Sequence, residues 1–356
     1  MKYLILPFCL FIAFQSFSQQ KNKTQNVILI TFDGLRWQEV FTGIDSALIE
    51  DKEFTSDKEN LKRLFWDADE KVRRQKLLPF FWTVMANEGQ LFGNRKSRNY
   101  VNVTNKQWFS YPGYNEILTG IADSTITSND KIDNKNITVL ELIHKQQPFQ
   151  GKVAAFGSWD VFPYIINEKR SGIPVNAGFE LAAGPLSEKE NFLNELQPQI
   201  PSPWSSVRLD AFTHHYALEH LKNKKPRLLY IAYGETDDYA HDGKYDAYIK
   251  SAQQTDKFIE EIWNWIQQEP SYKNKTTLIL TTDHGRGVGK QWTSHNSEIA
   301  GSDEIWIGLI GPDTEKRGEI MSSGQLYQNQ VAATLAWFLG FKYEKPGTGK
   351  SIIKEK

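Results

Sequence analysis

The chain has 356 residues, which is long enough for one large α/β domain that carries insertions. Hydrophobic residues make up 40% and charged residues 24%, a balance that excludes a fibrous or disordered chain. There are 42 Lys and Arg against 43 Asp and Glu, so the sequence lacks the basic excess of a nucleic-acid binder. We therefore expect a globular protein whose partner is a small molecule.

The first residues predict an export signal. One Lys precedes an apolar run from Tyr3 to Phe14, and small serines follow that run. This pattern is typical of a cleaved signal peptide over residues 1–18. The alternative, an uncleaved anchor, needs roughly 20 apolar residues, which is more than this run supplies. Cys9 is the single cysteine and lies inside the run, so the expectation is a secreted or periplasmic protein without disulfides, and without a membrane segment after cleavage.

Residues 19–356 predict a single catalytic domain, because short β-branched runs alternate with longer helical patterns. The expected strands are Asn26–Phe32, Arg227–Tyr233, Thr276–Thr282 and Ile305–Ile310. The expected helices are Leu209–Asn223, Tyr245–Gln268 and Gln328–Phe338. Two irregular stretches, about 43–74 and 163–206, are interpreted as insertions that cap the sheet. The predicted fold class is α/β, with a mostly parallel central sheet sandwiched by helices.

Residues able to bind metal follow three of these strands. They are Asp33 after the first strand, Asp237 and His241 after the second, Asp283 and His284 after the third, and His295 beyond a Gly-rich loop. Parallel strands bring their carboxyl ends to one edge of a sheet, so these side chains are expected to converge. Mixed His and Asp ligands are those that zinc and similar divalent ions take. An Asp after a strand is also often a helix N-cap, so the prediction depends on all six together.

Ser110 is the candidate nucleophile. It is followed by Pro112, Gly113 and the helix-like run NEILTG, which would put its hydroxyl at a helix N-terminus. Backbone N–H groups and the helix dipole favour an anion there, as a phosphate site requires. Thr104 is the alternative nucleophile, although it lacks the Pro and the helical continuation.

The order and wording of these segments resemble the alkaline phosphatase superfamily, in particular its nucleotide pyrophosphatase/phosphodiesterase branch and related sulfatase-like enzymes. The matching segments are TFDG, SYPGYNEILTG, ETDDYAH, TTDHG, and His295 followed by GSDEIW, which together span almost the whole mature chain. The resemblance implies two divalent ions, with zinc as the default and manganese or iron as alternatives. One ion would be held by Asp33, Ser110, Asp283 and His284, and the other by Asp237, His241 and His295.

The same resemblance implies hydrolysis of phosphate esters through a phosphoseryl intermediate on Ser110, which metal binding would activate. Sulfatases carry a Cys or Ser at the nucleophile and an Arg where this chain has Tyr114, so sulfatase activity by their route is disfavoured. In the segment GKVAAFGSWD, Ser158 and Trp159 stand where some monoesterases carry Lys and Arg. This favours a diester or nucleotide-type substrate, with Trp159 as a packing surface.

Further substrate contacts are assigned by position. Family enzymes place an Asn after the nucleophile to bind a phosphate oxygen; Asn129 is the candidate, and Asn134 competes with it. Lys152 or Arg286 could supply a cation. The alternatives to a diesterase are an alkaline phosphomonoesterase, a phosphonate hydrolase, a mutase, or a non-catalytic glycan-binding relative that uses the eleven Trp residues. The unmatched histidines, interpreted as surface or helix residues, are His144, His214, His215 and His220.

Overall fold

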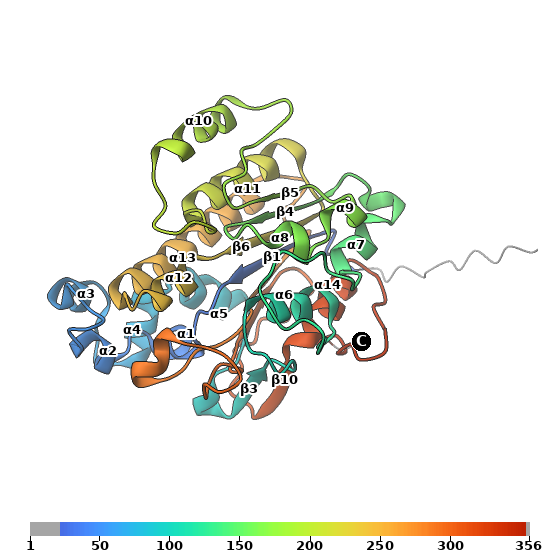
Figure 1. The fold of residues 1–356 in the computed structure, drawn as a ribbon. Helices are drawn as coiled ribbons and strands as arrows, with labels where there is room; N and C mark the ends of the chain where they lie inside the picture. The colour runs from blue at the N-terminus through green and yellow to red at the C-terminus, as the bar shows by residue number, and fades with distance from the viewer. Residues whose placement is uncertain (1–21, 354–356) are drawn as a thin grey trace, which may run out of the picture.

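The computed structural model describes residues 22–353 (Figure 1). The predicted signal peptide, residues 1–18, lies outside the described residues, as does Cys9. In the described part of the chain, no helix has the length and apolar character of a membrane span.

An eight-stranded sheet runs through the molecule in the order β5-β4-β6-β1-β7-β8-β2-β9. The strands are β1 Asn26–Phe32, β2 Gly89–Phe92, β4 Val153–Gly157, β5 Val175–Ala177, β6 Leu228–Tyr233, β7 Thr276–Thr282, β8 Ile307–Ile310 and β9 Gly318–Glu319. Only β8 runs antiparallel to its neighbours β7 and β2. A separate parallel pair joins β3 (Asn99–Asn102) to β10 (Gly324–Tyr327). The prediction of a mostly parallel central sheet is confirmed.

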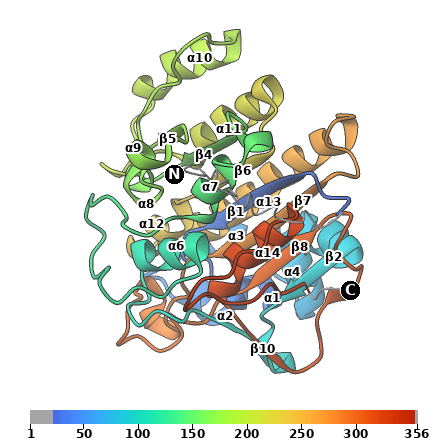
Figure 2. The same cartoon turned by 90° about the vertical axis from the view of Figure 1, so that its right-hand side faces the viewer.

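Helices cover both faces of this sheet (Figures 1 and 2). One face packs against α1 Trp37–Thr42, α2 Ser46–Glu50, α3 Lys58–Phe65, α4 Glu70–Leu77, α11 Asp210–Lys224 and α13 Tyr245–Gln268. The other packs against α6 Ser110–Thr119, α7 Val139–His144, α8 Phe162–Ile165 and α14 Val331–Phe338. Strand β1 shows why both layers are needed, since Ile28 and Ile30 belong to one core while Val27 and Leu29 belong to the other.

The longest expected elements are confirmed, with small differences at their ends. Strands β1 and β7 and helix α13 have the predicted bounds, and α11 begins one residue later than predicted. The strand expected from Ile305 begins at Ile307. The last helix begins as a 3-10 turn over Gln328–Gln330 before α14.

The two stretches interpreted as irregular caps contain regular structure. Residues 43–74 fold into α2, α3 and α4, and each of these helices begins at an Asp whose side chain caps it. Within 163–206, Val175–Ala177 pairs with β4 as an edge strand, so this part of the stretch belongs to the sheet. A strand of three residues is too short to give a periodic signal. The stretch also carries α9 Glu168–Ser171 and α10 Glu188–Leu196, and Figure 2 shows α10 projecting from the top of the molecule.

Candidate metal centre

Three segments with predicted metal ligands leave the sheet at the same level. Strand β1 lies between β6 and β7, and its last residue, Phe32, is in register with both Tyr233 and Thr282. Asp33 and Asp283 directly follow their strands, and helix α12 (Glu235–His241) begins just after β6. The parallel register therefore brings these residues to one edge of the sheet, as their positions after the strands predicted.

Asp33, Asp283 and His284 form the first group of neighbouring donor atoms. Nε2 of His284 lies 3.3 Å from Asp33 Oδ1 and 3.4 Å from Asp283 Oδ2. Neither oxygen has a hydrogen-bond partner among the described residues, and both are buried. Ser110 Oγ lies 3.4 Å from the same nitrogen. The Gly285 carbonyl, 2.9 Å from His284 Nδ1, can only accept a hydrogen bond, so the ring proton is on Nδ1 and the lone pair is on Nε2.

The surroundings of the first group oppose negative charge. Burial and the neighbouring Asp237 raise the pKa of Asp33 well above its usual range, and burial and Asp33 do the same to the pKa of Asp283. Tyr114 donates to Asp33 Oδ2 at 2.9 Å, and the Gly34 amide donates to Asp283 Oδ1 at 3.1 Å, so each carboxylate has one oxygen satisfied and one without a partner. Buried carboxylates of this kind stay ionised only next to a compensating cation. The first group therefore fits a divalent metal ion.

Asp237, His241 and His295 lie next to the first group. His241 Nε2 is 3.1 Å from Asp237 Oδ2 and 3.0 Å from His295 Nε2. The Nδ1 atom of His295 faces the Trp108 carbonyl at 3.2 Å, which leaves its Nε2 atom as a possible ligand. The rings of His295 and His284 stack with centroids 3.8 Å apart, so the two groups are in contact. The His241 side chain is 47% exposed and gives this group access to solvent.

Arg286 reaches into the second group. Its buried guanidinium donates to Asp237 Oδ1, and its Nη2 atom lies 3.4 Å from His241 Nδ1. The carbonyls of Trp292 and Thr293 accept from Nε at 2.8 Å and from Nη2 at 2.6 Å. Burial opposes the charge of Asp237, but Arg286 and then His241 outweigh it and hold the pKa of Asp237 well below its usual range. The second group therefore offers three donors to a cation, but it already contains a fixed positive charge.

That geometry changes the interpretation of Arg286. We predicted a substrate contact, whereas all three nitrogens of its guanidinium face a predicted ligand or loop carbonyls. This contact could not be predicted, because the direction of an Arg side chain in a loop depends on the tertiary contacts around it.

Ser110 is the first residue of α6, as predicted, and is 5% exposed. Asn129 lies beside it, because its Oδ1 atom accepts a hydrogen bond from the Tyr111 amide at 2.9 Å. Its Nδ2 group has no hydrogen-bond partner among the described residues. Asn134 is buried and donates to Asn115 at 3.1 Å, so it is part of the core under α6 and does not compete for this role.

Thr104, the alternative nucleophile, is engaged in a structural contact. Its hydroxyl donates to the buried Glu116 carboxylate at 2.8 Å, and its backbone N–H donates to the same carboxylate at 2.9 Å. The Asn105 amide completes this network at 2.7 Å. Thr104 thus fixes the loop before α6, whereas Ser110 faces the first metal group.

Trp159 and Lys152 lie at opposite ends of β4. Trp159 follows the carboxyl end of the strand and is partly buried. Its neighbour Ser158 donates to Asp210 at 2.6 Å, and Asp210 accepts from the Gly234 amide just before α12, so this segment borders the metal groups. Lys152 precedes β4, and its carbonyl bonds the backbone that leads into β6, at the amino ends of the strands. The prediction that Lys152 could supply charge at the site is therefore wrong.

Two glycines that the sequence analysis left without a role shape the site. Gly34 has φ +59°, and a Cβ atom there would lie 2.8 Å from Asp237 Oδ1 and 2.9 Å from Arg286 Nη1. At Gly113 a Cβ atom would lie 2.5 Å from the Asp283 carbonyl oxygen. The segments TFDG and SYPG could have indicated both, since a glycine beside a ligand or nucleophile often marks a close backbone approach.

Part of the chain is similar in sequence to known proteins. Residues 189–343 match the model of the Metalloenzyme superfamily, a range that contains Asp237, His241, Asp283, His284 and His295. Two curated relatives match at 25% identity, the 2,3-bisphosphoglycerate-independent phosphoglycerate mutases of Gloeobacter violaceus and Shewanella sediminis. The matches cover 39% and 45% of this chain, and only 26% and 28% of the relatives' own length.

Solved structures share the fold over most of the chain. The alignment with alkaline phosphatase PafA covers 94% of this chain and 98% of the PafA chain, with a TM-score of 0.62 and 10% sequence identity. The lipoteichoic acid synthase LtaP from Listeria monocytogenes covers 92% and 74%, with a TM-score of 0.58 and 13% identity. The 2-O GAG sulfatase BT1596 covers 92% and 73%, with a TM-score of 0.57 and 12% identity.

The chain thus combines a fold shared with alkaline phosphatase PafA with groups of donor atoms that could hold a metal ion. The sequence similarity to the Metalloenzyme superfamily covers residues 189–343, and the fold of the chain is alkaline-phosphatase-like.

Proposed function

We propose that this protein hydrolyses phosphate esters and that Ser110 forms the phosphoseryl intermediate. The observation that carries the proposal is the position of the Ser110 hydroxyl. It begins α6 and lies 3.4 Å from His284 Nε2, the nitrogen that also faces the two unpartnered oxygens of Asp33 and Asp283. A nucleophile at a helix N-terminus beside a cation site has the surroundings that phosphoryl transfer requires.

Each residue of the site would have its own role in the proposed reaction. Ser110 attacks phosphorus, and its new ester bond forms as the alcohol leaves; water then hydrolyses that ester and regenerates the hydroxyl. Asn129, beside the helix N-terminus, would donate its free Nδ2 group to a phosphate oxygen. Divalent ions held by the two groups would supply Lewis-acid stabilisation of the attacking and leaving oxygens. We propose zinc for both groups, because their ligands combine imidazole and carboxylate.

We further propose that the preferred substrates are diesters or nucleotide-type esters. Among the described lysines and arginines, only Arg286 contacts a predicted metal ligand, and its guanidinium is directed at Asp237. A monoester dianion needs more positive charge than a diester monoanion does. The partly buried Trp159, at the carboxyl end of β4, would pack against the second ester group. We also propose that the protein acts after export.

The test is an assay of purified protein with added zinc against p-nitrophenyl phosphate, bis-p-nitrophenyl phosphate, thymidine monophosphate nitrophenyl ester and p-nitrophenyl sulfate. We expect turnover of the two diesters to exceed that of the monoester and the sulfate. Ser110→Ala should lower diester turnover at least about a hundredfold, as removal of a nucleophile does, while Thr104→Ala retains it if folded. Mass spectrometry of acid-quenched reactions should find a phosphoryl group on Ser110, which still carries one nitrophenyl ester when the substrate is bis-p-nitrophenyl phosphate. Full turnover by Ser110→Ala would exclude this role.

The phosphoglycerate mutase relatives support a second candidate, transfer of a phosphoryl group between positions of one small acid. Including 3-phosphoglycerate in the assay tests it. Isomerisation of 3-phosphoglycerate without release of inorganic phosphate would favour a mutase, and hydrolysis of the diesters without any isomerisation of 3-phosphoglycerate would exclude it.

A further inference from the structure

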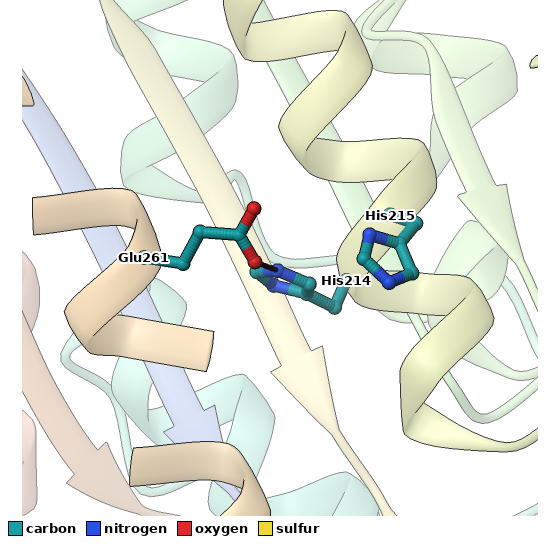
Figure 3. A group of neighbouring side chains, drawn as sticks. All are labelled: His214, His215 and Glu261. Carbon is teal, nitrogen blue, oxygen red and sulfur yellow. Dashed lines mark hydrogen bonds and ion pairs between the residues drawn. The ribbon is translucent and has the colours of Figure 1, made fainter. Parts of the chain in front are cut away.

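A second set of donor atoms lies outside the candidate metal centre. His214 and His215 are neighbours on α11, and Glu261 lies on the adjacent helix α13. One donor atom from each lies within 4.8 Å of the others. Figure 3 shows the His214 ring and the Glu261 carboxylate directed at each other, with the His215 ring beside them.

His214 lies on a helix, one of the two expected settings, but it is completely buried and its ring has neighbours on three sides. Its Nδ1 atom lies 3.0 Å from the Tyr233 hydroxyl, and its Nε2 atom lies 3.0 Å from Glu261 Oε2. The ring stacks on Phe258 with centroids 4.1 Å apart. Without a metal ion, Nε2–H can donate to Glu261 while Nδ1 accepts from the Tyr233 hydroxyl; in the other tautomer, with the proton on Nδ1, the ring presents a lone pair on Nε2 next to a carboxylate oxygen. Two acceptors 3.0 Å apart are the arrangement that a shared cation satisfies.

His215 adds a third donor with an unsatisfied atom. Its ring lies edge-on to His214 at 4.9 Å, and its Nδ1 atom is buried without a hydrogen-bond partner in the described structure. Burial, and then the nearby His214, lower the pKa of His215 to about 4. The hydrogen bond from His214 lowers the pKa of Glu261 to about 2. At neutral pH the cluster therefore has neutral imidazoles and an ionised carboxylate, the forms that bind metal.

The positive charges near the cluster are partly compensated. Lys189 and Lys222 are close enough to lower the pKa of both histidines. Both ammonium groups also approach the Glu219 carboxylate, at 3.3 Å and 4.0 Å. The Glu261 side chain is 47% exposed, so an ion could enter from solvent and keep water as a further ligand.

We infer that His214, His215 and Glu261 form a separate zinc site that joins α11 to α13. Two imidazoles and one carboxylate with an open position are a ligand set that zinc takes in proteins. Zinc bound there would link two helices on the same face of the sheet. The inference does not depend on the proposed phosphoesterase activity, because none of the three residues is a predicted ligand of the metal centre.

The test measures zinc bound at equilibrium by the full chain, using dialysis against buffered free zinc and elemental analysis. The variants are Glu261→Gln and His215→Ala; the control is Glu260→Gln, an exposed neighbour of Glu261 on α13. We expect each variant to bind one zinc fewer than the wild type and the control, with turnover of any active substrate unchanged. In cobalt-loaded protein, the same variants should lose part of the visible absorption.

Equal zinc content in Glu261→Gln, the control and the wild type would overturn the inference, and so would an equal loss in the control. His215→Ala provides the second readout, since Glu261→Gln alone could retain a weak ligand. Failure of the phosphoesterase assay leaves this comparison intact, because zinc content is measured without turnover.

Discussion

Arg286 donates a hydrogen bond to Asp237 while its other nitrogens bind the carbonyls of Trp292 and Thr293, just before His295 in the chain. One side chain thus connects the α12 ligands to the loop that carries the last predicted ligand. Its charge also lies where a second cation would bind. The two donor groups are therefore electrostatically unequal.

We predict that the metal centre, apart from the separate site at His214, His215 and Glu261, binds two divalent ions with unequal affinity and that Arg286→Gln reduces the difference. Glutamine can still donate to Asp237 but carries no charge, so removing the repulsion should tighten binding of the weaker ion about tenfold or more. Isothermal titration with zinc measures both affinities, with Arg227→Gln, a partly exposed arginine, as the control. Weaker binding in Arg286→Gln would show instead that Arg286 chiefly positions Asp237.

Gly113→Ala should disturb the metal centre from the opposite side. An added methyl group would lie 2.5 Å from the Asp283 carbonyl oxygen, so α6 or the end of β7 must move. We expect a loss of about 2 kcal/mol in the free energy of unfolding, together with weaker zinc binding. Gly324→Ala is the control, because its methyl group would meet its nearest neighbour at an ordinary 3.8 Å. Unchanged zinc affinity in a folded Gly113→Ala protein would contradict the prediction.

Asp256 should make stability depend on pH independently of metal. It is buried on α13 and accepts hydrogen bonds from the Phe80 and Phe81 amides at 2.8 and 3.1 Å, yet burial raises its pKa to about 7. The folded state therefore holds this proton more tightly than the unfolded state, and stability falls as pH rises from about 4 through 7.

Urea unfolding of metal-free protein at pH 5 and pH 8 measures this effect. We expect the loss of stability between the two pH values to be smaller in Asp256→Asn than in the wild type, because asparagine does not titrate. Glu260→Gln, on the same helix and exposed, should reduce the loss only slightly, because burial is the largest cause of the raised pKa of Asp256 and the charge of Glu260 is a smaller one. An equal loss in Asp256→Asn and the wild type would exclude Asp256 as its source.

Trp159→Ala should change substrate preference rather than the chemical step. If the indole packs against the second ester group, KM for bis-p-nitrophenyl phosphate should rise several-fold while KM for p-nitrophenyl phosphate stays constant. Trp265→Ala is the control, since this partly buried Trp of α13 packs against Tyr272 beyond the end of the helix. An equal effect on both substrates would remove Trp159 from a role in specificity.

The features that could be predicted from the sequence are the long periodic helices, the long apolar strands, and the ligands that directly follow those strands. The buried runs of β1, β6 and β7 are long and apolar, so their bounds and the residues that follow them could be read directly. Strand β5 was missed because three residues among prolines and aromatics carry no pattern. The contact of Arg286 with Asp237, and the burial of His214 under Phe258, depend on packing between distant segments, which a single sequence does not encode locally.

The shared register of Phe32, Tyr233 and Thr282 makes the metal centre a reporter of correct strand pairing. A slip of one residue in β6 or β7 would move its ligands by about 3.3 Å and turn the strand's side chains to the other face. Ligands from residues 33 to 295 then would not meet, and the ion would lose part of its coordination. Metal binding would therefore favour the one pairing in which all three strands are aligned. An ion present during folding would stabilise the native register over slipped registers.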